Sequence, residues 1–337
     1  MIIRSKAPLR LGLAGGGTDV SPYCDLYGGA ILNATINLYA YATIEPIDTD
    51  KIHFDSIDRK IEASYESALE LPRDGKLDLI KEVYNKVVKR FTNKPLSFRL
   101  STFLDAPAGS GLGASSTLVV AVLGAFTEWL KLPLGEYDIA HLAYEIERID
   151  LKMAGGRQDQ YSATFGGINF MEFYKDDKVI VNPLKIKEQY LEELAHNLLL
   201  YYTETSRFSS DIIESQMQNV LNKDVKSIEA SHHLKQQAEM MKEVLLKGEI
   251  NEVGRILDFG WQNKKKLTQG ISNSLLDEIY AEAMKSGATG GKISGAGGGG
   301  FMVFYCPDNK RYKVLEALTR FGGYEKKYSF TKEGLTS

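Results

Sequence analysis

The chain has 337 residues, of which 43% are hydrophobic, and this is enough for about two domains with sizeable cores. A formal net charge of -3 excludes the strongly basic surface on which nucleic-acid and acidic-membrane binding depend. Two cysteines are too few for a disulfide framework, and no apolar run approaches the ~18 residues of a membrane span. We therefore expect a soluble, cytoplasmic protein with neither nucleic acid nor membrane as a partner.

The first 185 residues predict strands and helices in mixed order. Segments rich in β-branched and aromatic residues indicate strands, and apolar residues at helical spacing indicate helices. We expect strands at 1–13, 30–45, 51–55, 60–64, 97–104, 168–174 and 178–183, and helices at 77–91, 115–131 and 134–150.

Long helical stretches become frequent beyond residue 185. We expect helices at 209–221, 223–246, 251–269, 273–286 and 310–321, and strands at 198–203, 301–305 and 324–330. This order favours an α+β fold, with an N-terminal domain at 1–185 and a C-terminal domain at 186–337. Because no low-complexity linker separates them, we expect the two domains to share an interface, where small-molecule clefts are common.

The segment 107–116, Pro-Ala-Gly-Ser-Gly-Leu-Gly-Ala-Ser-Ser, predicts a cradle for nucleotide phosphates. Its three alternating glycines let the backbone approach a ligand closely. The helix that follows offers free N–H groups to an anion, and the two serines can reach phosphate oxygens or a magnesium ion. The candidate ligands of the nucleotide are Pro107, Gly109, Ser110, Gly111, Leu112, Gly113, Ala114, Ser115 and Ser116.

Two other phosphate-binding loops fit this segment less well. A P-loop requires Lys followed by Ser or Thr after the last glycine, where this chain has Ala114 and Ser115. Gly109, Gly111 and Ala114 match the dinucleotide fingerprint, but the acidic residue at the required distance, Glu128, falls inside the expected helix 115–131. A glycine-rich turn between a strand and a helix is the purely structural alternative.

Polar residues near the N-terminus form a second candidate group. Arg10 on the first strand can supply a fixed guanidinium, and Asp19, after the glycine turn 15–17, can accept hydrogen bonds from sugar hydroxyls. The alternatives are a surface arginine and a helix N-cap. Further along, Glu145 and Glu147 are two residues apart, so at most one points into a site with Ser115, where a carboxylate and a hydroxyl can complete a magnesium shell.

Two further segments are too polar or too rich in glycine to form part of a hydrophobic core. The polar sequence 155–161 contains Asp159, our candidate for the group that accepts the proton of a substrate hydroxyl, with a nearby cation holding it ionised. A helix cap is its structural alternative. Four successive glycines at 297–300 are entropically costly, so we interpret the hairpin 292–300 as a close approach to a ligand.

With these segments in order, the chain resembles the GHMP kinases, named for galactokinase, homoserine kinase, mevalonate kinase and phosphomevalonate kinase. The segments 7–10 with 17–19, 107–116, and 294–300 are similar to the three motifs of that family and cover nearly the whole length. The resemblance implies a two-domain α+β fold, with a ribosomal protein S5 domain 2-like N-terminal domain and a ferredoxin-like C-terminal domain. It also implies a kinase that uses ATP and Mg²⁺ on a small molecule.

The resemblance further implies roles for single residues. Ser115 and Glu147 match magnesium ligands, although the spacing from Glu147 to Asp159 is one residue longer than in mevalonate kinase, which keeps Glu145 open. Asp159 matches the catalytic aspartate, and Arg10 matches its basic partner. The residues expected at the substrate are Asp19, Gly16, Gly17, Thr18, Arg157, Arg207, Gly297 and Gly298.

Within the family, the segments 13–19 and 156–161 are most similar to the D-glycero-D-manno-heptose 7-phosphate kinases, which phosphorylate the C1 hydroxyl and so make a 1,7-bisphosphate for nucleotide-heptose and surface polysaccharide. A substrate that already carries a phosphate needs a second cationic pocket, for which Arg207, Arg157, Lys6 and Lys152 are candidates. The lysine run 264–266 is expected to be a solvated helix face.

Two alternative functions stay open at this point. The chain is a C1 kinase of another sugar, such as fucose or galactose, or it is a nucleotide- and sugar-binding sensor without turnover. The oligomeric state is also open, with a homodimer as one option.

Overall fold

The computed structural model describes residues 1–107, 109–205 and 209–337. Its N-terminal domain is built on a seven-stranded sheet in which β4, β3, β5, β2, β6 and β7 follow one another and β1 pairs with β2. All pairings are antiparallel except that of β3 with β5. The strands are β1 (Ile3–Ala14), β2 (Gly29–Pro46), β3 (Lys51–Ser56), β4 (Ile61–Glu66), β5 (Phe98–Leu104), β6 (Ile168–Phe173) and β7 (Val179–Pro183).

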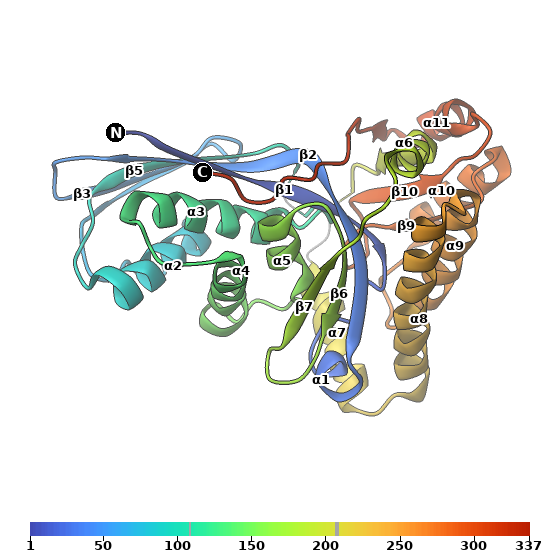
Figure 1. Cartoon of the computed structure of the whole chain (residues 1–337), viewed down its shortest axis with the longest axis horizontal. Coiled ribbons are helices and arrows are strands. Elements are labelled where there is room, and N and C mark those ends of the chain that lie inside the picture. The colour runs from blue at the N-terminus through green and yellow to red at the C-terminus, as the bar shows by residue number, and fades with distance from the viewer. Residues whose placement is uncertain (108, 206–208) are drawn as a thin grey trace.

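The long strand β2 organises this sheet. One of its edges pairs with β1 along nearly its whole length, whereas the other pairs with β6 through its first half and with β5 through its second. One face of the sheet is covered by helices (Figure 1): α2 (Asp78–Val87), α3 (Ala114–Leu130), α4 (Glu136–Tyr144) and α5 (Gln158–Phe165), with π-helical turns at Val88–Thr92 and Glu145–Asp150. Helix α3 lies against β1 and β2 and is apolar around most of its circumference, which fits its burial at the centre.

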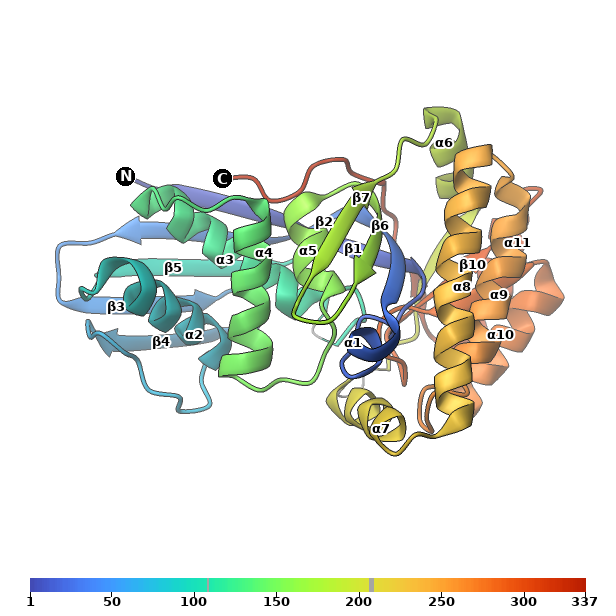
Figure 2. The same ribbon diagram turned by 60° about the horizontal axis from the view of Figure 1, so that its bottom comes forward.

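The C-terminal domain has a smaller antiparallel sheet in the order β11, β8, β10, β9. Helices α8 and α9 pack side by side, and α9 lies against β9 (Figure 2). The strands are β8 (Leu198–Tyr202), β9 (Gly290–Ile293), β10 (Phe301–Tyr305) and β11 (Tyr324–Glu325). The helices are α6 (Glu188–Asn197), α7 (Ser209–Leu221), α8 (Val225–Lys247), α9 (Val253–Lys264), α10 (Ser274–Ser286) and α11 (Arg311–Leu318), with 3-10 turns at Ile250–Glu252 and Thr319–Phe321.

One hydrophobic cluster joins the two domains. Leu11 and Leu32 from the first sheet lie in the same buried cluster as Leu200 and Phe301 from the second sheet and Met241 from α8. The two domains therefore share a core, as the missing linker predicted, and their relative position is held by apolar burial.

The expected elements agree with the structure over most of the chain. Three helices were not foreseen: α1 (Tyr23–Tyr27), α5 and α6. The expected helix 134–150 is interrupted, because α4 passes into a π-helical turn at Glu145–Asp150. The expected strand 324–330 is confined to β11, with one isolated bridge between Phe330 and Ile36.

The last residues of the chain lie on the N-terminal domain. After β11 the backbone crosses to the first sheet, and Thr336 forms a bridge with Lys6 on β1. Figures 1 and 2 both show this dark red segment ending beside the N-terminus. The side chain of Leu335 packs on the core of the first domain, where a Cβ on Gly124 of α3 would lie 2.6 Å from Leu335 Cδ1. The sequence-based boundaries assign this segment to the C-terminal domain (186–337), whereas in the structure it packs on the N-terminal domain.

We predict that Leu335→Ala lowers the free energy of unfolding by about 1–2 kcal/mol, because a partly buried leucine loses most of its apolar contact with the core. Urea denaturation measures the change. Leu246→Ala is the control, since Leu246 on α8 is 44% exposed, and an equal loss in both variants would contradict a stabilising role of the C-terminal segment.

Candidate active site

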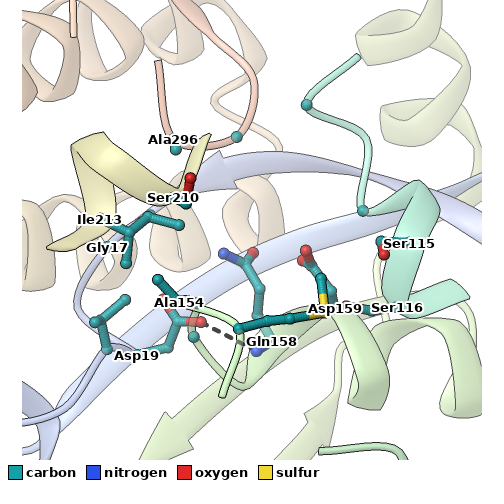
Figure 3. Close-up of a pocket in the computed structure, with 18 of the residues that line it drawn as sticks. Gly17, Asp19, Ser115, Ser116, Ala154, Gln158, Asp159, Ser210, Ile213 and Ala296 are labelled. Carbon is teal, nitrogen blue, oxygen red and sulfur yellow. Dashed lines mark hydrogen bonds between the residues drawn. The ribbon is translucent and has the colours of Figure 1, made fainter. Parts of the chain in front are cut away.

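A cavity of about 670 Å³ lies between the two domains. Its lining comes from β1 and the turn after it, the segment 109–116, residues 147–159, α7, α9, and β9 with its hairpin. Figure 3 shows Asp159 between Ser115 on one side and Gly17 and Asp19 on the other. The motifs that were separate in the sequence therefore meet at one site.

The glycine loop 109–116 packs backbone to backbone on the C-terminal domain. Gly111 has a positive φ of 81°, and a Cβ there would lie 2.3 Å from the carbonyl oxygen of Ser294. A Cβ on Gly300 would lie 2.5 Å from the carbonyl oxygen of Ser110. Only glycine fits at both positions, and the hydroxyl of Ser294 donates to the carbonyl of Gly111 at 2.8 Å. The two glycine-rich motifs therefore bring the domains into contact at the loop.

Most of the loop residues named from the sequence face the cavity. Seven of them line it: Gly109, Ser110, Gly111, Gly113, Ala114, Ser115 and Ser116. Two do not, since Pro107 is exposed and Leu112 is buried in the core shared by the domains. Helix α3 begins at Ala114, so its first turn presents free N–H groups at this point.

Arg10 connects the loop to Asp159. Its Nε and Nη2 both lie 2.7 Å from Asp159 Oδ1, and its Nη1 donates to the carbonyl of Gly111 at 2.6 Å. The arginine side chain is 4% exposed, whereas that of Asp159 is 21% exposed and open to the cavity. A Cβ on Gly113 would lie 3.1 Å from Asp159 Cγ, so the carboxylate sits directly beside the phosphate loop.

Asp19 caps helix α5. Its Oδ2 accepts hydrogen bonds from the backbone N–H groups of Arg157 (2.8 Å) and Gln158 (3.0 Å), of which Figure 3 draws the second. Burial raises the pKa of Asp19, and the charge of Asp159 adds to this, while the hydrogen bond from Gln158 opposes it. Asp19 therefore does not cap α1, the helix that follows it, whose N-cap is Pro22. Its side chain instead caps the N-terminus of α5, far away in the sequence, and it also lines the cavity.

The structure places only one of the two candidate glutamates, Glu147, at the cavity. Glu147 is fully buried and lines the cavity, where its Oε2 accepts a hydrogen bond from Gln160, which also donates to Ser116 Oγ. Glu145 instead pairs with Lys86 (3.5 Å) and Arg90 (3.2 Å) outside the cavity. Because this stretch is π-helical, the direction of Glu147 cannot be read from α-helical spacing.

Two lysines at the cavity were missed as site residues. Lys264 is 3% exposed and donates to the carbonyl of Gly16 at 3.3 Å, and Lys292 is 4% exposed and donates to the carbonyl of Gly12 at 2.6 Å. The expectation that Lys264 belongs to a solvated helix face is wrong. The sequence contained a signal for this burial, because Lys264 comes seven residues, or two helical turns, after Leu257 and so lies on the same buried face of α9.

Burial changes the titration of both lysines. It lowers the pKa of Lys264 to about 8, which corresponds to about 3 kcal/mol of destabilisation of the folded protein at neutral pH. Burial also lowers the pKa of Lys292 well below its usual value, and the charges of Lys264 and Arg10 lower it further. The unfolded chain binds more protons than the folded one between about pH 8 and the usual value of 10.5, so this penalty is present below pH 8 and disappears as the pH rises.

Several residues expected at the substrate have other positions. Gly16 and Gly17 line the cavity, but the hydroxyl of Thr18 is buried and donates to the carbonyls of Gly15 and Ala30. Gly297 and Gly298 pack on the backbone of Ile271, and the hairpin meets the cavity through Gly295 and Ala296 instead.

The cationic side chains that the sequence suggested for a second phosphate do not come together in one pocket. The guanidinium of Arg157 points away from the main cavity and binds Asp25 (3.1 Å), Asp177 (2.8 Å) and the carbonyl of Tyr174. Lys6 faces Glu333 on the surface, while Lys152 lines the cavity. Arg207 lies outside the described residues.

Helix α7 contributes a wall that the sequence did not reveal. Ser210, Ile213, Glu214 and Gln216 line the cavity from the C-terminal domain, and Figure 3 labels the first two. Gln216 donates to the carbonyl of Gly17 at 2.8 Å and so attaches α7 to the turn after β1. No motif marks these residues, because their place depends on how α7 docks across the cavity.

Comparison with known proteins identifies the family. Residues 78–167 match the model for the GHMP kinases N-terminal domain, and residues 241–323 match the model for the GHMP kinases C-terminal domain. The chain is 52% identical to a D-glycero-alpha-D-manno-heptose 7-phosphate kinase of Campylobacter jejuni, over 99% of this chain and 98% of that protein. This chain belongs to the GHMP kinases.

Solved structures agree with this assignment. A structure described as a D-glycero-D-manno-heptose 1-phosphate kinase from Bacteroides thetaiotaomicron has a TM-score of 0.85 and 46% identity, covering 99% of this chain and 98% of that one. A galactokinase of Lactococcus lactis in complex with galactose has a TM-score of 0.79 at 15% identity, covering 99% and 95% of the two chains, and so shares the fold. No helix among residues 1–107, 109–205 and 209–337 is both long and apolar enough to cross a membrane.

The polar groups that line the cavity of this GHMP kinase fit a magnesium ion. In the part of the chain that the structure describes, Glu147 Oε1 is buried without a hydrogen-bond partner, and its nearest cation is Arg148 at 3.7 Å. A buried carboxylate oxygen in this state is suited to a metal ion. Ser115 adds a hydroxyl at the start of α3. Magnesium takes few protein ligands and completes its shell with phosphate and water oxygens, so these two groups suffice.

Proposed function

We propose that this GHMP kinase transfers the γ-phosphoryl group of ATP to the C1 hydroxyl of D-glycero-D-manno-heptose 7-phosphate. The 1,7-bisphosphate formed would feed the synthesis of nucleotide-activated heptose for surface polysaccharide. The similarity to the Campylobacter jejuni kinase over nearly the full length of both chains supports this substrate. The observation that carries the reaction is the position of Asp159, which lies beside Gly113 of the phosphate loop and is held there by Arg10.

Different residues of the cavity have different roles in phosphoryl transfer. The loop 109–116 and the first turn of α3 hold the phosphates through backbone N–H groups. Asp159 accepts the C1 hydroxyl proton as the hydroxyl oxygen bonds to the γ-phosphorus and the bond to ADP breaks. Arg10 fixes Asp159 and places positive charge beside the transferring group. Ser115 and Glu147 would hold magnesium, which would supply positive charge to neutralise that of the phosphates.

An ADP-release assay over a panel of acceptors tests this function. The panel contains the heptose 7-phosphate, the heptose 1-phosphate, the free heptose, fucose and galactose. We expect the heptose 7-phosphate to give the highest kcat/KM by roughly tenfold or more, with phosphorus NMR placing the new phosphate on C1. A preference for fucose or galactose would assign another sugar, and no ADP release with any acceptor would indicate a sensor.

We predict that Asp159→Asn lowers kcat by about 10² or more, because the amide cannot accept the hydroxyl proton. The affinity for ATP should change little, since Asp159 does not belong to the phosphate loop. Steady-state kinetics and a nucleotide-binding titration measure the two effects. Asp308→Asn on the surface is the control, and a variant at 159 that keeps most of its kcat would remove Asp159 from the role of base.

We predict that Glu147→Gln raises the Mg²⁺ concentration for half-maximal rate by roughly tenfold or more, because a neutral amide binds the cation far more weakly than a carboxylate. Glu145→Gln is the matched control two residues away, and it should leave this concentration unchanged. Magnesium titrations of the initial rate compare the variants. Equal shifts in both would argue against Glu147 as the ligand.

A further inference from the structure

Two buried ammonium groups reach the same part of the cavity from different elements of the C-terminal domain. Lys264 is the last residue of α9 and contacts the carbonyl of Gly16, while Lys292 lies on β9 and contacts the carbonyl of Gly12. Both carbonyls belong to β1 and the turn that follows it. The mechanism described above uses neither lysine.

Neither lysine has a carboxylate partner in the part of the chain that the structure describes. Within residues 1–107, 109–205 and 209–337, no carboxylate lies within ion-pair distance of either ammonium group. Asp19 is the acidic group that acts on Lys264, but its Oδ2 is occupied by the N–H groups of Arg157 and Gln158. Each ammonium has three donors, and one carbonyl satisfies only one of them. Buried cations are normally paired with an anion, so this arrangement is incomplete without one.

The lysines lie on the acceptor side of Asp159. A Cβ on Gly12 would be 3.8 Å from both Lys292 Nζ and Gln158 Oε1, and Gln158 precedes Asp159 in the chain. Lys264 lies farther along, where a Cβ on Gly16 would be 3.6 Å from its Nζ. In Figure 3, Ser115 at the start of α3 lies on one side of Asp159, whereas Gly17, the neighbour of the Gly16 that Lys264 contacts, lies on the other. An anion at the lysines would therefore belong to the acceptor rather than to ATP.

We propose that Lys264 and Lys292 bind the non-reacting phosphate of a phosphorylated sugar substrate. This inference rests on the proposed function and assigns the second cationic pocket that a sugar phosphate requires. Two ammonium groups can surround a phosphate from two sides, and Gly16 leaves the space beside Lys264 free of a side chain. The pocket would thus select a phosphorylated sugar over its free form.

The test compares Lys264→Met and Lys292→Met with Lys266→Met, a control in the turn after α9, where Lys266 is exposed. We expect KM for the heptose 7-phosphate to rise roughly 10- to 100-fold in the first two variants, because each loses a charge-assisted contact to phosphate. KM for ATP should stay within about threefold, and kcat/KM for the free heptose should not fall. Lys264→Arg should recover part of the affinity, since it keeps the charge.

Thermal denaturation provides a readout that separates binding from folding. Without ligand, Lys264→Met should melt at the same temperature as the wild type or higher, because a buried, unpaired charge has been removed. With ADP and Mg²⁺ present to occupy the phosphate loop, inorganic phosphate should further raise the melting temperature of the wild type and of Lys266→Met, but not of the two pocket variants.

Several outcomes would overturn the assignment. A rise in KM for ATP without one for the sugar phosphate would place the lysines at the nucleotide, and unchanged KM values would leave them without this role. A lower melting temperature together with an unchanged KM would make them structural. If the wild type prefers an unphosphorylated sugar, the proposed function fails, whereas the response to inorganic phosphate still decides whether the lysines form an anion pocket.

Discussion

The whole site depends on one buried guanidinium. Arg10 on β1 holds Asp159 through two nitrogens and the carbonyl of Gly111 through the third. A buried cation is stable only when its partners stay in place, so a shift of the phosphate loop relative to α5 would break one of these contacts. The arginine therefore fixes the distance between Asp159, the proposed proton acceptor, and the loop 109–116, which we propose holds ATP; this is the geometry that phosphoryl transfer needs most.

The C-terminal domain completes this arrangement by close backbone packing. The hairpin after β9 lies on the phosphate loop, where Gly111 and Gly300 leave no room for a side chain. Its glycines therefore serve the contact between domains more than contact with a ligand. The same hairpin follows Lys292, so the packing that supports the loop 109–116 also brings a cation to the cavity. Binding and catalysis are thus coupled to the docking of the two domains.

The buried lysine pair lowers the stability of the folded protein. An enzyme that must bind an anion in a dry pocket keeps positive charge there before the ligand arrives, and this charge destabilises the folded state. The large core shared by Leu32, Met241 and Phe301 across the domains can offset such a loss. Buried charge without a partner is therefore informative, because packing alone would not retain it.

The sequence by itself determined the motifs and most elements. The spacing of Gly109, Gly111 and Gly113 before an apolar helix is a local property, and so is the strand that carries Arg10, because both follow from backbone freedom and side-chain periodicity. Tertiary structure decided which groups face the cavity. The π-helical turn selects Glu147 over Glu145, the docking of α9 buries Lys264, and the capping of α5 uses Asp19 from a distant segment. These outcomes depend on contacts between residues far apart in the chain, which no local pattern specifies.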